Sequence, residues 1–161
     1  MFAMLDGMDE GKIPCPRYLD GGKSVQATWR PQLHFMGCVI GGCLEHYTVS
    51  EPDLAKDSNN TLTTLVRAID LATREYGKRN LDVPEHFALL VDNTARENRN
   101  TFIMTFAAIL VATNRFRSFT LLFFLVGHTH NRMDKRFGTL GHRISLAKTL
   151  QDPEEFREHL R

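Results

Sequence analysis

The fold is decided by the stretch Phe123-Phe-Leu-Val-Gly-His-Thr-His-Asn-Arg-Met-Asp134, in which an apolar run gives way to polar side chains. The run from Leu121 to Val126 is unbroken, which is typical of a strand that is buried on both faces. After it come three side chains that can bind metal: His128, His130 and Asp134. A strand that delivers polar groups at its carboxyl end is a common way to build a site in an α/β sheet. The stretch therefore predicts an α/β fold with a candidate site at this strand end.

A purely structural interpretation also fits this stretch. A strand-to-helix turn capped by Thr129 or Asn131, with two surface histidines, would have the same sequence. We favour a functional site because two further acids, Asp6 and Asp92, also follow directly on apolar runs. Three carboxylates brought together would repel one another strongly without a cation, so such a cluster is rarely structural alone.

The rest of the chain predicts strands first, and then strands that alternate with helices. We expect strands over residues 2–5, 33–40, 43–49, 87–91 and 118–126, and helices over residues 61–76, 101–113, 131–150 and 152–161. Gly41-Gly42 predicts a hairpin turn, and residues 10–32, with several Pro and Gly, predict an irregular insertion. The order predicts one domain over residues 1–161, with a five-stranded mixed sheet and helices on its faces. Because the first expected strand already begins at residue 2, we expect this chain to be a piece of a longer protein.

The expected helices carry apolar residues at the 3.6-residue period. In the helix 61–76, capped by Asn60 and ended by Gly77, the apolar positions are Leu62, Leu65, Val66, Ile69, Ala72 and Tyr76. In the helix 101–113 they are Phe102, Phe106, Ile109, Leu110 and Thr113. In the helix 131–150 they are Met133, Phe137, Leu140, Ile144 and Ala147. Each set predicts the face that packs on the sheet.

Composition sets limits on the class of protein. Hydrophobic residues make up 42% and charged residues 24% of the chain, as in ordinary globular domains. The net charge of +1 gives no whole-chain argument for a nucleic-acid partner. The three cysteines have no CxxC spacing, which argues against a zinc knuckle and a disulfide scaffold and favours a reducing, intracellular setting, with the nucleus as one candidate. No apolar run is long enough for a transmembrane helix, so we expect no membrane partner.

The element order and the three acids together resemble the ribonuclease-H-like superfamily, which includes retroviral integrases and DDE-type transposases. In that superfamily one catalytic Asp lies on the first strand, a second lies at the end of the fourth, and a third acid lies on the helix after the fifth. The matching positions in this sequence are Asp6, Asp92 and Asp134. The first and fourth strands are neighbours in that fold, so the resemblance implies that Asp6 and Asp92 lie together.

Three separated motifs give a closer resemblance, to an uncharacterised domain family of transposon-like eukaryotic proteins. The motifs are Asp6-Gly-Met-Asp9 with Lys12, Asp92-Asn93 with Arg96 and Asn98, and Gly127-His-Thr-His130 with Asp134 and Phe137. This chain has Asn131 where relatives often carry an acid. The resemblance covers most of the chain and brings no established activity with it.

The superfamily resemblance implies metal-dependent cleavage or strand transfer on nucleic acid. Carboxylates suit Mg²⁺ or Mn²⁺, and Asp6, Asp92 and Asp134 are the candidate catalytic ligands, with Asp9 as the alternative first acid. His128 and His130 are further candidate ligands, and imidazole shifts the preference towards Mn²⁺ or Zn²⁺. His130 is also a candidate catalytic residue, because a histidine can move protons near neutral pH.

Basic residues flank the acids and predict contacts with a nucleic-acid backbone. Such residues would hold phosphates without reading bases. The superfamily resemblance implies DNA as a partner, and we also expect other domains of a longer chain. The candidates are Lys12, Arg96, Arg99, Arg132, Lys135 and Arg136.

Two alternatives stay open at this point. The chain could be a non-catalytic module derived from a transposase that binds nucleic acid or protein. Gly127-His-Thr-His130 is also similar to the last motif of calcineurin-like metallophosphoesterases. Those enzymes need an Asp-x-His motif on the first strand and an Asn-His pair, whereas this chain has Met8 and Thr94 at the histidine positions.

Overall fold

The structure is a computed structural model of the 161-residue chain, and it describes residues 1–8, 15–18, 30–124, 132–147 and 149–160. The strands are β1 (Phe2–Gly7), β2 (Arg17–Tyr18), β3 (His34–Ile40), β4 (Leu44–Ser50), β5 (His86–Val91), β6 (Ser118–Phe123) and β7 (Thr149–Leu150). The helices are α2 (Ser58–Lys78), α3 (Thr101–Ala112), α4 (Arg132–Leu146) and α5 (Pro153–Leu160). The order of the main strands and helices is the predicted one.

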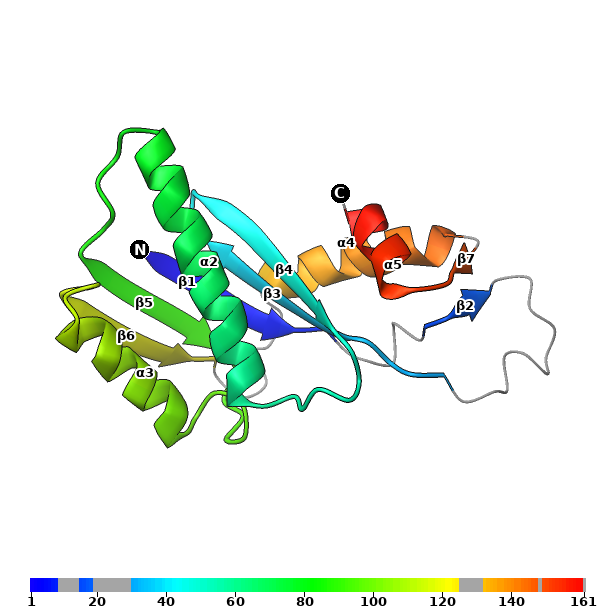
Figure 1. Cartoon of the computed structure of the whole chain (residues 1–161), viewed down its shortest axis with the longest axis horizontal. Helices are drawn as coiled ribbons and strands as arrows, with labels where there is room; N and C mark the ends of the chain where they lie inside the picture. Colours follow the sequence, from blue (N-terminus) through cyan, green and yellow to red (C-terminus); the bar gives the residue numbers. More distant parts are fainter. Residues whose placement is uncertain (9–14, 19–29, 125–131, 148, 161) are drawn as a thin grey trace.

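Five strands form one mixed sheet in the order β4-β3-β1-β5-β6 (Figure 1). β1 pairs antiparallel with β3 and parallel with β5, and β5 pairs parallel with β6. The turn between β3 and β4 lies at the predicted glycines, where Gly42 has a φ of +71°, a value that glycine adopts without strain. The predicted five-stranded mixed sheet is confirmed, and its arrangement is consistent with a ribonuclease-H-like fold.

Helices cover both faces of this sheet and give the molecule two cores. α2 and α3 lie over one face, where Leu5, Cys38 and Leu89 of the strands pack with Leu65 and Ile69 of α2. α4 lies over the other face, and α5 lies beside α4 and β7. The core on this side is made by Met8, Phe35, Val39, Met133, Phe137 and Phe156, among others. Successive side chains of β1 and β3 pack alternately into the two cores, as the two-residue period of a strand requires.

Helix α2 is longer than predicted at both ends. Its N-cap is Asp57 rather than Asn60, because the Asp57 carboxylate accepts hydrogen bonds from the backbone N–H groups of Asn59 and Asn60. The helix also continues past Gly77 to Lys78, and Asn80 takes the left-handed conformation with a φ of 52°. Asn tolerates that conformation better than most residues, so Gly77 is not needed to end the helix.

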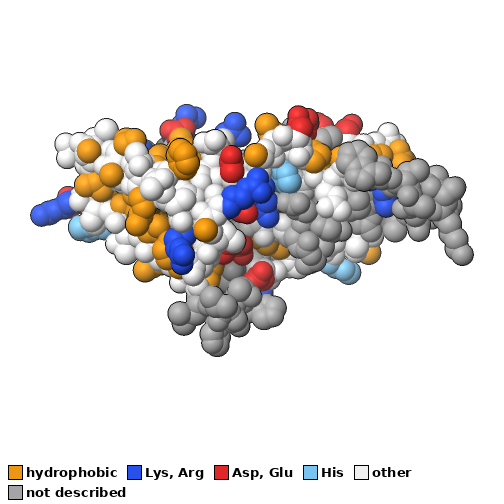
Figure 2. Space-filling model, turned by 90° about the horizontal axis from the view of Figure 1, so that it is seen from below, with side chains coloured by type: hydrophobic (Ala, Val, Ile, Leu, Met, Phe, Trp, Pro, Cys, Tyr) orange, Lys and Arg blue, Asp and Glu red, His pale blue; other side chains and the backbone are white. Residues whose placement is uncertain are grey.

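Helix α3 does not bury the face that its sequence predicted. Of its residues only Ile103 is fully buried, with Phe106 and Leu110 packed partly against the core. Phe102 is 66% exposed and Ile109 is 51% exposed. The reason is that α3 contains no charged residue, so its apolar pattern runs all round and does not define one side. Figure 2 shows hydrophobic side chains gathered at the end of the molecule that holds α3 and β6. No helix in the described part of the chain combines the length and apolar character that a bilayer span requires.

The predicted helix 131–150 is wrong at its C-terminal end. α4 stops at Leu146, and Thr149–Leu150 forms β7, which pairs antiparallel with β2. The predicted insertion 10–32 is therefore not irregular throughout, because β2 lies inside it. The apolar face of α4 is confirmed, since Met133, Phe137 and Ile144 are buried. The helix that follows Asp152 is α5, and its Phe156 packs edge-on against Phe35.

Gly37 of β3 allows α4 to lie close to the sheet. A Cβ atom at this position would overlap with Cε of Met133 and would lie 3.0 Å from Cε1 of Tyr47. Met133 is fully buried, so its side chain has little room to move away. We expect Gly37→Ala to lower the free energy of unfolding, measured by urea titration, by about 1–3 kcal/mol.

The matched control is Gly138→Ala in α4. A Cβ atom there would have no other heavy atom within 4 Å, so this substitution should raise stability by up to about 1 kcal/mol through helix propensity. A Gly37→Ala variant as stable as the parent would contradict the packing of α4 on β3.

Candidate functional site

The parallel pairing of β1 with β5 brings two of the predicted acids together. Phe2, Ala3 and Met4 lie opposite Ala88, Leu89 and Leu90. β1 continues to Gly7 and β5 ends at Val91, so Asp6 and Asp92 lie at the carboxyl ends of neighbouring parallel strands. This is the position at which α/β sheets commonly bind ligands. The predicted adjacency of the strands that end at Asp6 and at Asp92 is confirmed.

Asp6 lies on the face of the sheet that α4 covers. It pairs with Gly37 of β3, and Met4, two residues earlier on the same face, packs in the core beneath α4. The backbone N–H of Gly7 donates to Oδ1 of Asp6 at 2.8 Å. Asp6 is half-buried, so its carboxylate is fixed by neighbours yet not removed from solvent.

Asp92 is held through one of its two carboxylate oxygens. The hydroxyl of Thr94 donates to Oδ1 of Asp92 at 2.8 Å, and the side-chain amide of Asn98 donates to the same atom. Hydrogen bonds of this kind to a charged group are stronger than those between neutral groups, so they orient the carboxylate. Within the described residues Oδ2 accepts no hydrogen bond, and this oxygen is the one available to a ligand.

Asn98 connects Asp92 to helix α2. Only 4% of Asn98 is exposed, and its Oδ1 accepts a hydrogen bond from the Thr61 hydroxyl at 3.3 Å. Next to it, the amide of Asn100 donates to Oγ of Ser58 at 2.7 Å, and the Ser58 hydroxyl donates to the carbonyl oxygen of Arg96 at 3.1 Å. The loop that carries Asp92 is thus fastened to the first turns of α2 by buried polar contacts.

Sequence reasoning missed the part that Ser58 and Thr61 play. Both residues lie on the inner side of α2 and are buried although they are polar. Buried polar side chains need hydrogen-bond partners. Their partners are in a loop distant in sequence, so the pattern of α2 alone could not identify them.

Asp134 lies in the first turn of α4, next to the buried Met133. The Met133 methyl packs where a Gly37 side chain would be, and Gly37 is the strand partner of Asp6. The start of α4 is therefore placed over the end of β1 that carries Asp6. Asp134 itself is half-buried.

The described residues form only part of the predicted site. Among them, no three His, Cys, Asp or Glu side chains are grouped so that they could hold a metal ion. The candidates Asp9, Lys12, His128 and His130 lie outside the described residues, as does the side chain of Arg132. The structure thus brings Asp6 and Asp92 to neighbouring strand ends and starts the helix of Asp134 over one of them.

The four predicted basic residues whose side chains the structure describes fall into two groups. Arg96, Arg99 and Lys135 are exposed, and Arg99 reaches the side-chain oxygen of Asn93 at 3.4 Å. Arg136 instead forms an ion pair with Glu45 of β4, at 2.7 Å, which holds it beside the sheet edge. Arg96 and Arg99 follow Asp92 in the sequence, and Lys135 follows Asp134, so these three residues flank the candidate acids.

Cys38 and Met8 are both core residues. Cys38 packs with α2 on the face of the sheet opposite Asp6, and burial raises the pKa of its thiol to about 12. Burial also raises the pKa values of Cys15 and Cys43. Met8 stands where the metallophosphoesterase alternative requires a histidine, and it is a core residue with 2% of its surface exposed.

We expect Asn98→Ala to lower the free energy of unfolding by about 1–3 kcal/mol. The substitution removes the donor to Asp92 and leaves the buried Thr61 hydroxyl without its acceptor. The control is Asn93→Ala, an exposed neighbour whose loss should change stability by less than about 0.5 kcal/mol. Urea titration of both variants checks the account, and equal stabilities would refute the polar link between the Asp92 loop and α2.

Comparison with known proteins identifies the family of this chain. The profile of a domain of unknown function (DUF7869) matches residues 23–160, which is most of the sequence. No curated protein and no solved structure gives a significant match. The matched region contains β3 to α5, with Asp92, Asn98 and Asp134, so the chain belongs to the DUF7869 family.

Proposed function

We propose that this chain is a ribonuclease-H-like core that cleaves or joins phosphodiester bonds of DNA with the help of divalent metal ions. The observation that supports this most is the parallel β1–β5 pairing, because it puts the carboxyl end of the strand that carries Asp6 beside the end of the strand that precedes Asp92. The strand order β4-β3-β1-β5-β6 and the start of α4 over Asp6 add to it. Membership of the ribonuclease-H-like superfamily is part of the proposal.

The side chains at this place fit hard divalent cations. Mg²⁺ and Mn²⁺ prefer oxygen ligands, and the carboxylates of Asp6, Asp92 and Asp134 are the groups that would hold them, with His128 and His130 as further candidates. Bound ions would stabilise the charge that develops on the transferring phosphate. Asn98 and Thr94 contribute by fixing one oxygen of Asp92, which leaves its second oxygen directed to a ligand.

The exposed Arg96, Arg99 and Lys135 supply the positive charge that a nucleic-acid backbone needs. In hydrolysis, a water oxygen forms a bond to phosphorus, a bridging P–O bond breaks, and the leaving oxygen takes up a proton. In strand transfer, a 3′ hydroxyl oxygen replaces the water. Contacts to phosphates alone would make the binding insensitive to sequence and sensitive to salt.

We expect Asp92→Asn to reduce nicking of supercoiled DNA in Mn²⁺ or Mg²⁺ by at least about 100-fold. Substitution of a residue that only supports a metal ligand can already reduce activity by about that factor. The fold should be retained, because the amide oxygen that replaces Oδ1 can still accept from Asn98. Asp82→Asn, an exposed acid outside the site, is the control and should nick at the parent rate.

The variants Asp6→Asn and Asp9→Asn show which residue is the first of the three catalytic acids. The variant that loses nicking identifies that residue. Nicking by Asp92→Asn at the parent rate would disprove the proposed catalytic acids. If the parent binds DNA in a salt-dependent manner and no metal supports nicking, the chain is the non-catalytic module instead.

A further inference from the structure

Helix α3 exposes apolar side chains that a folded protein normally buries. Its sequence from Thr101 to Ala112 contains no charged residue, and Met104 is 59% exposed in addition to Phe102 and Ile109. A helix that is apolar on every side is usually buried within protein or spans a membrane. A helix of 12 residues is about 18 Å long, which is too short to cross a bilayer core of about 30 Å. The exposed side of α3 is therefore suited to contact with protein.

The exposed side chains form two rows along α3. The buried Ile103 marks the side of the helix that packs on the sheet. Because a helix has 3.6 residues per turn, positions seven residues apart lie on the same side. Phe102 and Ile109 therefore form one exposed row. Met104 and Val111 form a second row on the other flank of the helix.

Helix α2 extends this apolar surface. α2 and α3 lie side by side: Asn100 at the start of α3 donates to Ser58 at 2.7 Å, and Arg115 beyond its end donates to the Thr73 hydroxyl. Val66 lies seven residues before Thr73, on the same side of α2, so it borders α3. It is 47% exposed. We call the combined surface the α3 face; it consists of Val66, Phe102, Met104, Ala108, Ile109 and Val111.

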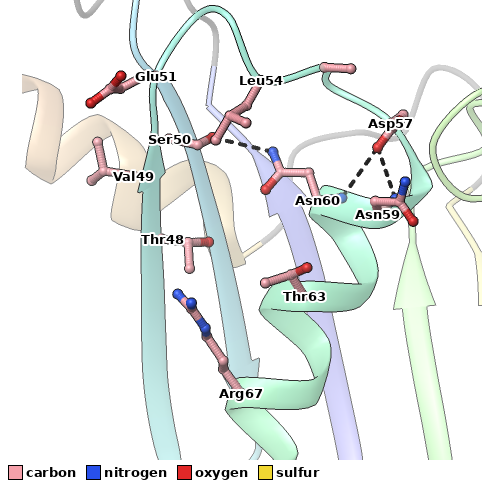
Figure 3. Close-up of a pocket in the computed structure, with 11 residues that line it drawn as sticks. Thr48, Val49, Ser50, Glu51, Leu54, Asp57, Asn59, Asn60, Thr63 and Arg67 are labelled. Carbon is pink, nitrogen blue, oxygen red and sulfur yellow. Dashed lines mark hydrogen bonds between the residues drawn. The ribbon is translucent and has the colours of Figure 1, made fainter.

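The opposite side of α2 has a different character. It borders a groove of about 530 Å³ beside β4 and the loop that follows β4. Figure 3 shows Asn60 and Arg67 of α2 in this groove, where the Asn60 amide donates to the Ser50 hydroxyl at 3.5 Å. Glu51 and Asp57 also line the groove, so it contains both signs of charge. The α3 face, by contrast, consists of apolar side chains only.

The size of the α3 face suits a dimer interface. Scaled by their exposed fractions, its five large side chains present roughly 450 Å² of apolar surface, given that a whole Phe side chain covers about 200 Å². A standard interface buries about 800 Å² on each partner, and about 65% of a homodimer interface is apolar, which amounts to about 500 Å². The α3 face therefore supplies most of the apolar area that a homodimer needs.

The absence of charge makes the α3 face complementary to itself. In a two-fold dimer the same patch meets its own copy, so a charged patch would bring like charges together. Two α3 helices that cross at about 50°, the commonest angle in globular proteins, would place the small, exposed Ala108 at the crossing point. Arg99 and Arg115 lie beyond the two ends of α3, where an interface has its polar rim.

We propose that the α3 face binds a second copy of this chain, so that the protein is a dimer in which the two α3 helices pack against each other. The large side chains of each copy lie on both sides of the crossing point and are removed from water. The interaction is independent of the proposed phosphodiester chemistry, because the α3 face contains none of the candidate acids and needs neither metal nor DNA.

Sedimentation velocity of the full chain over about 1–100 μM tests this proposal, and we expect a dimer that forms as the concentration rises. Ala108→Arg should raise the dissociation constant of the dimer at least about 100-fold, because it puts a long, charged side chain at the crossing point. Ala108 is exposed and Arg is a good helix former, so the monomer should stay folded, as circular dichroism can check.

Ile109→Lys should weaken the dimer to a similar extent, because it places a charge within the apolar contact. A lysine in the last turn of a helix is favourable in the monomer, so the fold should again be retained. The matched control is Leu146→Lys at the end of α4. Leu146 is 67% exposed and lies outside the α3 face, so this variant should dimerise like the parent.

A parent chain that stays monomeric at about 100 μM would overturn the proposal. A dimer that both Ala108→Arg and Ile109→Lys leave unchanged would also overturn it, because the interface would then lie elsewhere. Loss of the dimer in Leu146→Lys, to the same extent as in the two α3 variants, would contradict the assignment to α3 as well.

Discussion

The parallel pairing of β1 with β5 is the constraint on which the rest of the structure depends. It joins the first strand to a strand from the middle of the chain, and it puts Asp6 and Asp92 at the same edge of the sheet. The antiparallel pairing with β3 then sets Gly37 beside Asp6, and the absence of a side chain at Gly37 lets α4 begin above it. The strand pairings of β1 thus determine both where α4 packs on the sheet and where the candidate acids lie.

The polar groups around Asp92 are organised by tertiary contacts rather than by local sequence. Asn98 serves as the link, because its amide donates to Asp92 while its oxygen accepts from Thr61 of α2. A buried amide satisfied on both sides fixes the loop more firmly than exposed contacts do. This is the arrangement expected of a side chain that must be held ready for a ligand, and it motivates the assignment of Asp92 to the centre of the site.

Much of the fold could be predicted from the sequence, because unbroken apolar runs and the 3.6-residue period reflect burial directly. The face of α4 was predicted correctly, since Met133, Phe137 and Ile144 alternate with polar residues. The buried face of α3 was not, because a helix without charges gives no contrast between its sides. The Asp57 cap and the β2–β7 pairing were missed because side-chain geometry and contacts between distant segments determine them. The adjacency of Asp6 and Asp92 came from a family resemblance and not from the residues alone.

The proposed function requires that Asp6 and Asp92 together hold a divalent cation. The most direct measurement is anomalous X-ray diffraction from crystals of this chain soaked in Mn²⁺. We expect an anomalous peak between the two carboxylates, about 2.1 Å from an oxygen of each. A soaked crystal in which Mn²⁺ occupies other positions, with no peak beside Asp6 and Asp92, would contradict it.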